Sequence, residues 1–331
     1  MQTLPFLRVA MVLIALAILA AFVAPAAAAP PCVPAAFERG TITRRPYVVM
    51  IDNHPNAYPQ TGLDKAAVVF EALAESGITR FMAVYIPGVS PDAPSIGPVR
   101  SARLYFVRWA MGMNGMYIHA GGAPDALKRA REAQEIIDVD ALVRSGGAYF
   151  TRVRTRKAPH NLYTSTARLD QAAARFGNAE INDPELGFPI KAEAPPEQRP
   201  AAQELGYYFI YRQDSVGWTY DPVSNVYLRL RRGKPAVDAA TGQQLRASNV
   251  VVIEVQERPI PGDPKGRIQQ DVVGSGPGFL FQDGVAREIT WRKESEAAPL
   301  RFYLADGSEA AMNPGQVWIA AVPKLGNLTV R

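Results

Sequence analysis

Residues 116–134 read MYIHAGGAPDALKRAREAQ and decide which class of fold the chain adopts. The first four residues are a short apolar run, typical of a buried strand, and a turn follows at Gly121 and Gly122. Pro124 then opens a predicted helix that extends to residue 134, because proline is favoured in the first helical turn. A strand, a glycine turn and a helix in succession predict an α/β layer structure.

The segments on either side of this unit repeat the alternation of strands and helices. Helices are predicted at residues 101–111, with Ser101 as the N-cap, and at residues 166–176, ending at Gly177. We therefore expect an α/β domain with a mixed sheet over residues 45–182. Apolar, β-branched runs bounded by turn residues predict further strands at residues 47–51, 67–73 and 79–86.

The C-terminal half of the chain has a different composition. Residues 183–203 are rich in Pro, Glu and Ala and are expected to form a linker. Residues 204–331 contain short strand patterns separated by turns, among them an Asp283-Gly284 hairpin signal. The glycine-rich residues 274–278 lack the Lys-Ser/Thr ending of a phosphate loop, so we expect a hairpin or bulge there. The predicted fold class is α+β or α/β, with an N-terminal mixed-sheet α/β domain followed by a smaller antiparallel β domain.

Residues 1–31 have the pattern of a secretory signal peptide. They contain one charged residue, Arg8, followed by an apolar run and a stretch of alanines. An uncleaved N-terminal anchor is the alternative, and both predict an exported, periplasmic or extracytoplasmic protein. Cys32 is the only cysteine, so no internal disulfide can form, and Pro30-Pro31 before it argue against lipidation.

Composition excludes several classes of function. The formal net charge is +5 in 331 residues, and there is no Lys/Arg run, aromatic platform or zinc spacing, so no nucleic-acid partner is expected. A serine hydrolase is not indicated, because the Gly-x-Ser-x-Gly motif is absent. The three histidines lack His-x-x-x-His spacing, which disfavours a zinc site.

Basic residues are concentrated in the middle of the chain. Residues 97–157 contain eleven Lys/Arg and five Asp/Glu. Arginine presents a planar set of donors to phosphate or carboxylate, and glycine lets backbone N–H groups approach the same ligand. We therefore predict an anion-binding site in which motifs from this region converge. Its candidate residues are Arg100, Ser101, Arg103, His119, Gly121, Gly122, Arg156, Lys157, His160 and Asn161.

The first predicted strand ends in Asp52 and His54, at the position where ligands sit in open α/β sheets. Asp52 is a candidate ligand for a divalent cation beside a phosphate, since hard cations prefer carboxylate oxygens. The alternative for this whole set is structural. The arginines would then form surface ion pairs, and His119 would be a buried histidine bonded to the backbone.

The same motifs resemble the YerB-like lipoprotein family, exported bacterial proteins that carry a two-part domain of unknown function. The resemblance covers nearly the whole mature chain, and it implies an envelope location and two domains but no established activity. The N-terminal motifs are residues 49–55, 78–81, 96–103, 117–122 and 158–163. The looser C-terminal motifs are residues 274–276, 283–284 and 313–318.

The order of the N-terminal motifs is also similar, more distantly, to the LytR-CpsA-Psr ligases. Those enzymes transfer glycopolymers from polyprenyl-pyrophosphate carriers to peptidoglycan. That resemblance implies that Arg80, Arg100 and Arg103 contact a pyrophosphate and that Asp52 lies near Mg²⁺. The chain departs from the pattern at Ser101, which follows Arg100 where that family has an aspartate.

These observations lead to three functional hypotheses. The first is an envelope protein that binds an anionic, phosphate-bearing ligand without an assigned reaction. The second is a phosphotransferase that acts on a lipid-linked glycan with Mg²⁺. The third is a non-catalytic envelope scaffold, with a protein partner bound through the C-terminal domain.

Overall fold

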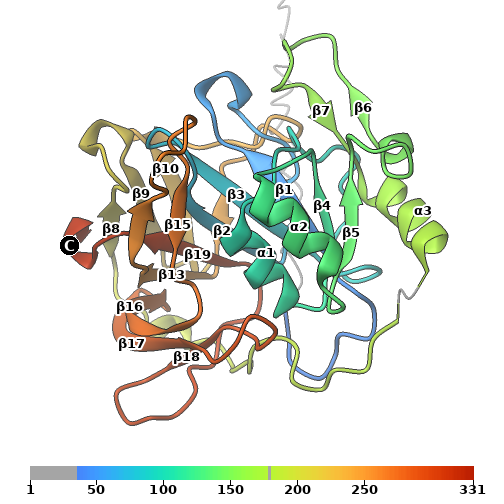
Figure 1. Ribbon diagram of the computed structural model, residues 1–331. Helices are drawn as coiled ribbons and strands as arrows, with labels where there is room; N and C mark the ends of the chain where they lie inside the picture. The colour runs from blue at the N-terminus through green and yellow to red at the C-terminus, as the bar shows by residue number, and fades with distance from the viewer. Residues whose placement is uncertain (1–35, 178–179) are drawn as a thin grey trace, which may run out of the picture. The chain divides into compact units, whose positions relative to one another are not determined.

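A mixed ten-stranded sheet forms the centre of the computed structural model, which describes residues 36–177 and 180–331 (Figure 1). The predictions for residues 1–31 and for Cys32 lie outside the described residues. In spatial order the strands are β18 (Arg301–Tyr303), β17 (Val285–Lys293), β16 (Gly274–Gln282), β13 (Asn249–Glu254), β19 (Val317–Val322), β2 (Val68–Leu73), β3 (Thr79–Tyr85), β1 (Tyr47–Asp52), β4 (Met116–His119) and β5 (Ile137–Asp140).

Strands from both halves of the sequence build this sheet. β19, from the C-terminal half, pairs in parallel with β2 on one side and with β13 on the other. At the other end of the sheet β1, β4 and β5 are parallel neighbours, whereas β3 runs antiparallel between β1 and β2. The carboxyl ends of β1 and β4 therefore lie at the same edge, with the first residues of β3 beside them.

A second, antiparallel sheet is built from the C-terminal half alone. Its order is β11 (Lys234–Pro235), β10 (Val226–Arg231), β9 (Val216–Asp221), β8 (Glu204–Tyr207) and β20 (Leu328–Val330), and β12 (Arg246–Ala247) also pairs with β10. Two short hairpins complete the strands: β14 (Glu257–Pro259) with β15 (Ile268–Gln270), and β6 (Thr151–Arg152) with β7 (Leu162–Tyr163). The predicted fold class, a mixed-sheet α/β part and an antiparallel β part, is confirmed.

Alternation along the strands sends side chains to two hydrophobic cores. On one face of the large sheet, Val48 and Met50 pack against α1 (Leu104–Met111) and α2 (Pro124–Glu132), which Figure 1 shows in front of the strands. On the other face, Val49 and Ile51 belong to the core that contains α3 (Thr166–Phe176) and the inner side of the second sheet.

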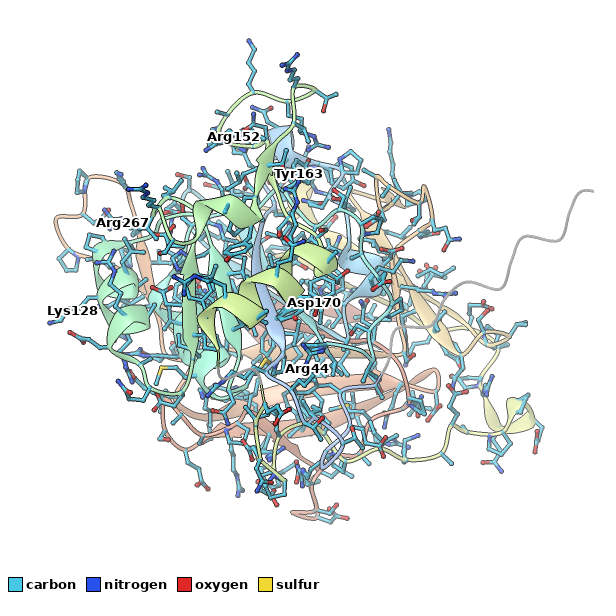
Figure 2. The ribbon with its side chains drawn as sticks, turned by 90° about the vertical axis from the view of Figure 1, so that its right-hand side faces the viewer. Arg44, Lys128, Arg152, Tyr163, Asp170 and Arg267 are labelled. Atoms are coloured by element: carbon cyan, nitrogen blue, oxygen red, sulfur yellow. The ribbon has the colours of Figure 1, made fainter. Side chains whose placement is uncertain are left out.

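α3 is fixed to the sheet by polar contacts as well as by its apolar face. Ser165 caps it, as its hydroxyl accepts a hydrogen bond from the backbone N–H of Arg168 at 3.3 Å. The hydroxyl of Tyr47 on β1 donates to Asp170 at 2.6 Å, and Arg44 lies 3.7 Å from the same carboxylate (Figure 2). The helix thus has the predicted bounds and covers the first strand of the sheet.

The start of the first helix was predicted wrongly. α1 begins at Leu104, and its N-cap is Arg103, which makes no side-chain capping bond, so Ser101 is not the N-cap. The preceding backbone is extended because it pairs with the glycine turn: the N–H of Ala102 donates to Gly121 at 2.8 Å. Because this pairing holds the backbone extended, the helix cannot begin at residue 101.

A linker at residues 183–203 and a boundary between the two predicted domains stay predictions. Part of this segment packs onto the sheet: Leu186 and Phe188 are buried in the same core as α1. No helix in the described residues is long and apolar enough to cross a membrane.

Candidate functional site

Four of the predicted site residues meet at the carboxyl end of β1, and we call them the Asp52 cluster: Asp52, His54, Arg100 and His160. Asp52 is 2% exposed, and its Oδ2 lies 3.0 Å from Nε of Arg100 and 2.7 Å from Nδ1 of His160. Its Oδ1 accepts a hydrogen bond from the His54 backbone N–H at 3.0 Å. The carboxylate therefore organises three segments that are far apart in the sequence.

The outer side of the Asp52 cluster carries polar groups that have no partner among residues 36–177 and 180–331. A carboxylate only accepts hydrogen bonds, so Nδ1 of His160 carries the hydrogen that Asp52 receives. Within the described ranges, the two terminal nitrogens of Arg100 make no hydrogen bond to any residue. Nε2 of His160 makes none either. Their side chains are 27% and 12% exposed, which makes these groups available to a ligand.

The two imidazole rings of the Asp52 cluster stack on one another. Their centroids are 4.5 Å apart with an interplanar angle of 18°. Nδ1 of His54 accepts a hydrogen bond from the backbone N–H of Asn56 at 3.1 Å, so the neutral ring carries its hydrogen on Nε2. Partial burial lowers the pKa of His54, and the nearby His160 and Arg100 lower it further despite Asp52. His54 is thus kept as a neutral hydrogen-bond donor.

The charge of Asp52 is maintained by its neighbours. Burial alone would raise the pKa of this carboxyl group, but hydrogen bonds from His160 and the His54 backbone outweigh that effect. With the positive charges of Arg100 and Arg80, they hold the pKa of Asp52 below its ordinary value. Asp52 is therefore an anion that anchors basic groups.

A second group, which we call the Glu75 cluster, lies beside the first: Arg80, Arg103 and Glu75. Arg80 is directly opposite Asp52 in the β1–β3 register, and its Nη1 donates to the Ser101 carbonyl at 2.9 Å. Glu75 forms ion pairs with both Arg80, at 3.5 Å, and Arg103. Both arginines are buried, and the Nε of each lacks a hydrogen-bond partner in the described part of the chain.

The Glu75 cluster separates Arg103 from Arg100. The extended segment before α1 directs these two arginines to two different carboxylates. Glu75 itself was missed. A single glutamate in the turn between two strands carries no motif that distinguishes it from a surface residue, so only the topology could reveal its role.

His119 and the glycine turn lie next to this site but face inward. The His119 ring is 0% exposed, with Nε2 2.6 Å from Asp138 Oδ1 and Nδ1 2.9 Å from the Gly121 carbonyl. Both ring nitrogens are therefore engaged within the protein. Gly122 is needed for close packing, because a Cβ there would lie 3.0 Å from the Cβ of Ala102.

The remaining predicted residues brace the loops around the Asp52 cluster. Nη2 of Arg156 donates to the Pro59 carbonyl at 2.6 Å. Asn161 accepts a hydrogen bond at 2.7 Å from Arg152, which lies in the β6–β7 hairpin and is labelled in Figure 2. Lys157 is exposed, and its carbonyl accepts the His160 backbone N–H at 3.0 Å. These contacts position His160 on its loop.

The role of Asp52 as a metal ligand gains no support from its neighbours. Among the described residues, no group of three or more His, Cys, Asp or Glu side chains is placed to hold a metal ion. Both oxygens of Asp52 already accept hydrogen bonds, Oδ1 from the His54 backbone N–H and Oδ2 from His160 Nδ1, and Oδ2 also forms an ion pair with Arg100. Metal binding at Asp52 stays a prediction.

A two-part chain with this sheet and this cluster belongs to the DUF3048 family. The family description "Protein of unknown function (DUF3048) N-terminal domain" matches residues 35–179, and the corresponding C-terminal domain matches residues 207–319. The chain is similar to "Putative lipoprotein YerB" of Bacillus subtilis (strain 168), with 33% identity over 303 residues, 87% of this chain and 84% of the relative.

A solved structure shows the same similarity in three dimensions. The crystal structure of YerB protein from Bacillus subtilis matches with a TM-score of 0.76 and 31% identity, covering 88% of this chain and 94% of that chain. The resemblance to the YerB-like family inferred from the sequence motifs is confirmed.

Proposed function

We propose that the chain is an exported cell-envelope protein that binds an anionic, phosphate-bearing ligand at the Asp52 cluster. The signal-peptide pattern of residues 1–31 supports export, and so does the name of the relative, "Putative lipoprotein YerB". The ligand class follows from the charges and hydrogen-bond donors at the carboxyl end of β1.

The observation that carries this proposal is the free end of Arg100. Its Nε is held by the buried carboxylate of Asp52, so the side chain is fixed while both terminal nitrogens remain without a partner in the described residues. A fixed guanidinium with two parallel donors suits two oxygens of a phosphoryl group. His54 Nε2–H provides a further donor beside it, and His160 Nε2 a site that can accept a proton.

The charge balance around this position also favours an anion. The two clusters contain three guanidinium groups, on Arg80, Arg100 and Arg103, and two carboxylates, on Asp52 and Glu75. One positive charge is therefore uncompensated, and burial strengthens its attraction for an anion relative to a surface charge. A bound phosphate would supply the missing counter-charge.

Titration calorimetry with inorganic pyrophosphate and with farnesyl pyrophosphate tests the proposal. We expect wild type to bind at least one of them and Arg100→Ala to weaken that binding by about tenfold or more, as expected for the loss of charge-assisted hydrogen bonds. Arg131→Ala, which removes an exposed arginine of α2, is the matched control and should bind like wild type. Binding of farnesyl pyrophosphate alone would assign a lipid-linked ligand.

Two outcomes would refute the proposal. One is the absence of heat with both ligands for wild type. The other is equal affinity of wild type and Arg100→Ala, which would place the ligand elsewhere. A Tm of the variant within about two degrees of wild type separates loss of binding from loss of folding.

The Asp52–His160 hydrogen bond favours a second candidate, a phosphotransferase that resembles the LytR-CpsA-Psr ligases. A carboxylate that holds Nδ1–H leaves Nε2 of the ring as a proton acceptor, the arrangement used for general-base catalysis. His160→Gln should then abolish transfer from a polyprenyl-linked glycan in the presence of Mg²⁺ while pyrophosphate binding through Arg100 persists. If wild type binds pyrophosphate but shows no turnover, the phosphotransferase candidate is refuted and only the binding function stands.

A further inference from the structure

The second sheet has a cavity on its outer face, remote from the Asp52 cluster. The cavity has a volume of about 330 Å³. Alternation along β8 and β9 sends the side chains of Leu205, Tyr207, Val216 and Trp218 into the core, and these residues and those between them all border the cavity. Its volume lies within the range of small-molecule sites, roughly 300–1,000 Å³.

Two glycines form the floor of this cavity. Gly206 on β8 lies directly opposite Gly217 on β9, and Leu230 on β10 is the next cross-strand neighbour of Gly217. Glycine weakens a strand interior, so paired glycines need a reason. At Gly206 the backbone gives no reason for a glycine. Its φ is outside the left-handed region, and a Cβ would meet only the Val216 carbonyl oxygen, at an ordinary 3.6 Å. The missing side chains keep the cavity open.

The walls combine an aromatic ring with polar groups. The Arg212 guanidinium lies 5.1 Å from the ring centroid of Tyr208, and both residues line the cavity. Thr219, Asn327 and Thr329 add hydroxyl and amide groups that both donate and accept hydrogen bonds. The charged residues of the lining are two arginines, Arg212 and Arg331, and one acid, Glu204.

We propose that this cavity binds an oligosaccharide that carries a carboxylate. A pyranose ring has an apolar C–H face that packs on an aromatic ring and a rim of hydroxyl groups that need mixed donors and acceptors. Tyr208 supplies the first, and the threonine and asparagine side chains supply the second. The Arg212 guanidinium forms no ion pair with an acidic side chain in the described residues, and it selects an acidic sugar, because a guanidinium pairs with a carboxylate through parallel hydrogen bonds. This site is independent of the proposed phosphate site.

Calorimetry with tetragalacturonate, and with chitotetraose as the neutral sugar, tests the inference on the whole purified protein. Wild type should bind tetragalacturonate more tightly than chitotetraose. Gly206→Trp should fill the cavity and weaken tetragalacturonate binding by about tenfold or more, because the indole would occupy the space that the sugar needs. Lys234→Trp, on the exposed edge strand β11, is the matched control and should bind like wild type.

Further variants separate the contributions and guard against misfolding. Tyr208→Ala should also weaken tetragalacturonate binding, whereas Tyr208→Phe, which keeps the ring, should stay within about threefold of wild type. Arg100→Ala should leave sugar binding unchanged, so that failure of the phosphate proposal is distinguished from failure of this one. The inference is overturned if wild type binds neither sugar, if Gly206→Trp binds as well as wild type, or if chitotetraose binds more tightly.

Discussion

At the scale of single residues, buried carboxylates determine what the basic side chains can do. Asp52 fixes Arg100 and His160 but leaves their outer nitrogens without a partner in the described part of the chain, whereas Glu75 forms ion pairs with both Arg80 and Arg103. A side chain whose inner end is held by the protein and whose outer end is unpaired is suited to binding. Because it is already oriented, it loses little conformational entropy when a ligand binds. Arg100 is in that position.

Lys293 provides a test of the same electrostatics away from the site. Its side chain is fully buried, and burial lowers its pKa to about 7. The unfolded chain, with the ordinary value of 10.5, binds more protons between pH 7 and pH 10.5, so stability should rise with pH across that window. Lys293→Met should therefore show a smaller increase in Tm than wild type between pH 7 and about pH 9.5.

The control for this prediction is an exposed lysine. Lys234→Met, on the exposed strand β11, should keep the wild-type dependence of Tm on pH. Parallel Tm curves for wild type and Lys293→Met would show that the buried amine does not titrate in this window.

Much of the Asp52 cluster could be predicted from the sequence, because Asp52, His54, Arg100 and His160 all stand in motifs with turn residues around them. The sequence also predicted correctly that His119 ends a strand, which is β4. It did not reveal which residues surround the ring. Asp138 and Asp140, which surround it, are contributed by the neighbouring strand β5. Which strand lies beside which is a property of topology, and no local pattern specifies it.

At the scale of secondary-structure elements, the β16–β17 hairpin is held by a polar residue in its turn. Asp283 and Gly284 form its turn, both with positive φ, as the Asp-Gly signal predicted. The Asp283 carboxylate lies 2.6 Å from Lys191 Nζ and accepts hydrogen bonds from Asn225 and Asn313 at 2.9 and 2.7 Å. One side chain thus ties the turn to three other segments.

Replacing this aspartate should destabilise the protein. Despite the opposing effect of burial, these hydrogen bonds lower the pKa of Asp283 to about 2, so its contribution is present above pH 4 and is lost as the pH falls toward 2. We expect Asp283→Ala to reduce the free energy of unfolding at pH 7 by about 3 kcal/mol, measured by urea denaturation. Asp283→Asn tolerates the positive φ and should lose less; equal losses would mean that the carboxylate network, not backbone conformation, accounts for the effect.

Element boundaries show where sequence patterns are reliable and where they fail. The bounds of β4 and α3 agree with prediction, because hydrophobic periodicity and the flanking glycines act locally. The glycine-rich residues 274–278 were expected to form a hairpin or bulge, and they are the first half of β16, one strand of the β16–β17 hairpin. The reason for the glycines themselves is long-range and could not be predicted: a Cβ at Gly276 would lie 2.6 Å from the indole nitrogen of Trp291, and one at Gly278 would lie 2.8 Å from the Val252 carbonyl.

At the scale of the whole molecule, the large sheet joins the two halves of the sequence. The sequence patterns identified the strands of both halves but not their pairing, because β19 and β2 are separated by more than two hundred residues. Between the sheets, the Arg229–Glu71 ion pair, 2.8 Å apart and nearly fully buried, lies among Trp218, Trp318 and Phe81. A residue from the N-terminal half thus neutralises a buried charge from the C-terminal half.

This arrangement predicts that the halves do not fold separately. Residues 36–200 alone would leave the parallel edge of β2 unpaired and the apolar contacts of Val69 and Phe81 with the C-terminal half uncovered. We expect each half to show little cooperative unfolding by calorimetry, and a mixture of the two to recover it. A cooperative transition for residues 36–200 on their own would contradict this expectation.

The order in which β19 appears in the sequence has a consequence for biogenesis. Because residues 317–322 occupy the middle of the sheet, a nascent chain cannot complete its central layer until β19, more than two hundred residues after β2, has been synthesised. Under the proposed export, the precursor must stay unfolded until it has crossed the membrane. We expect the late synthesis of β19 to delay completion of the fold and so to favour that passage.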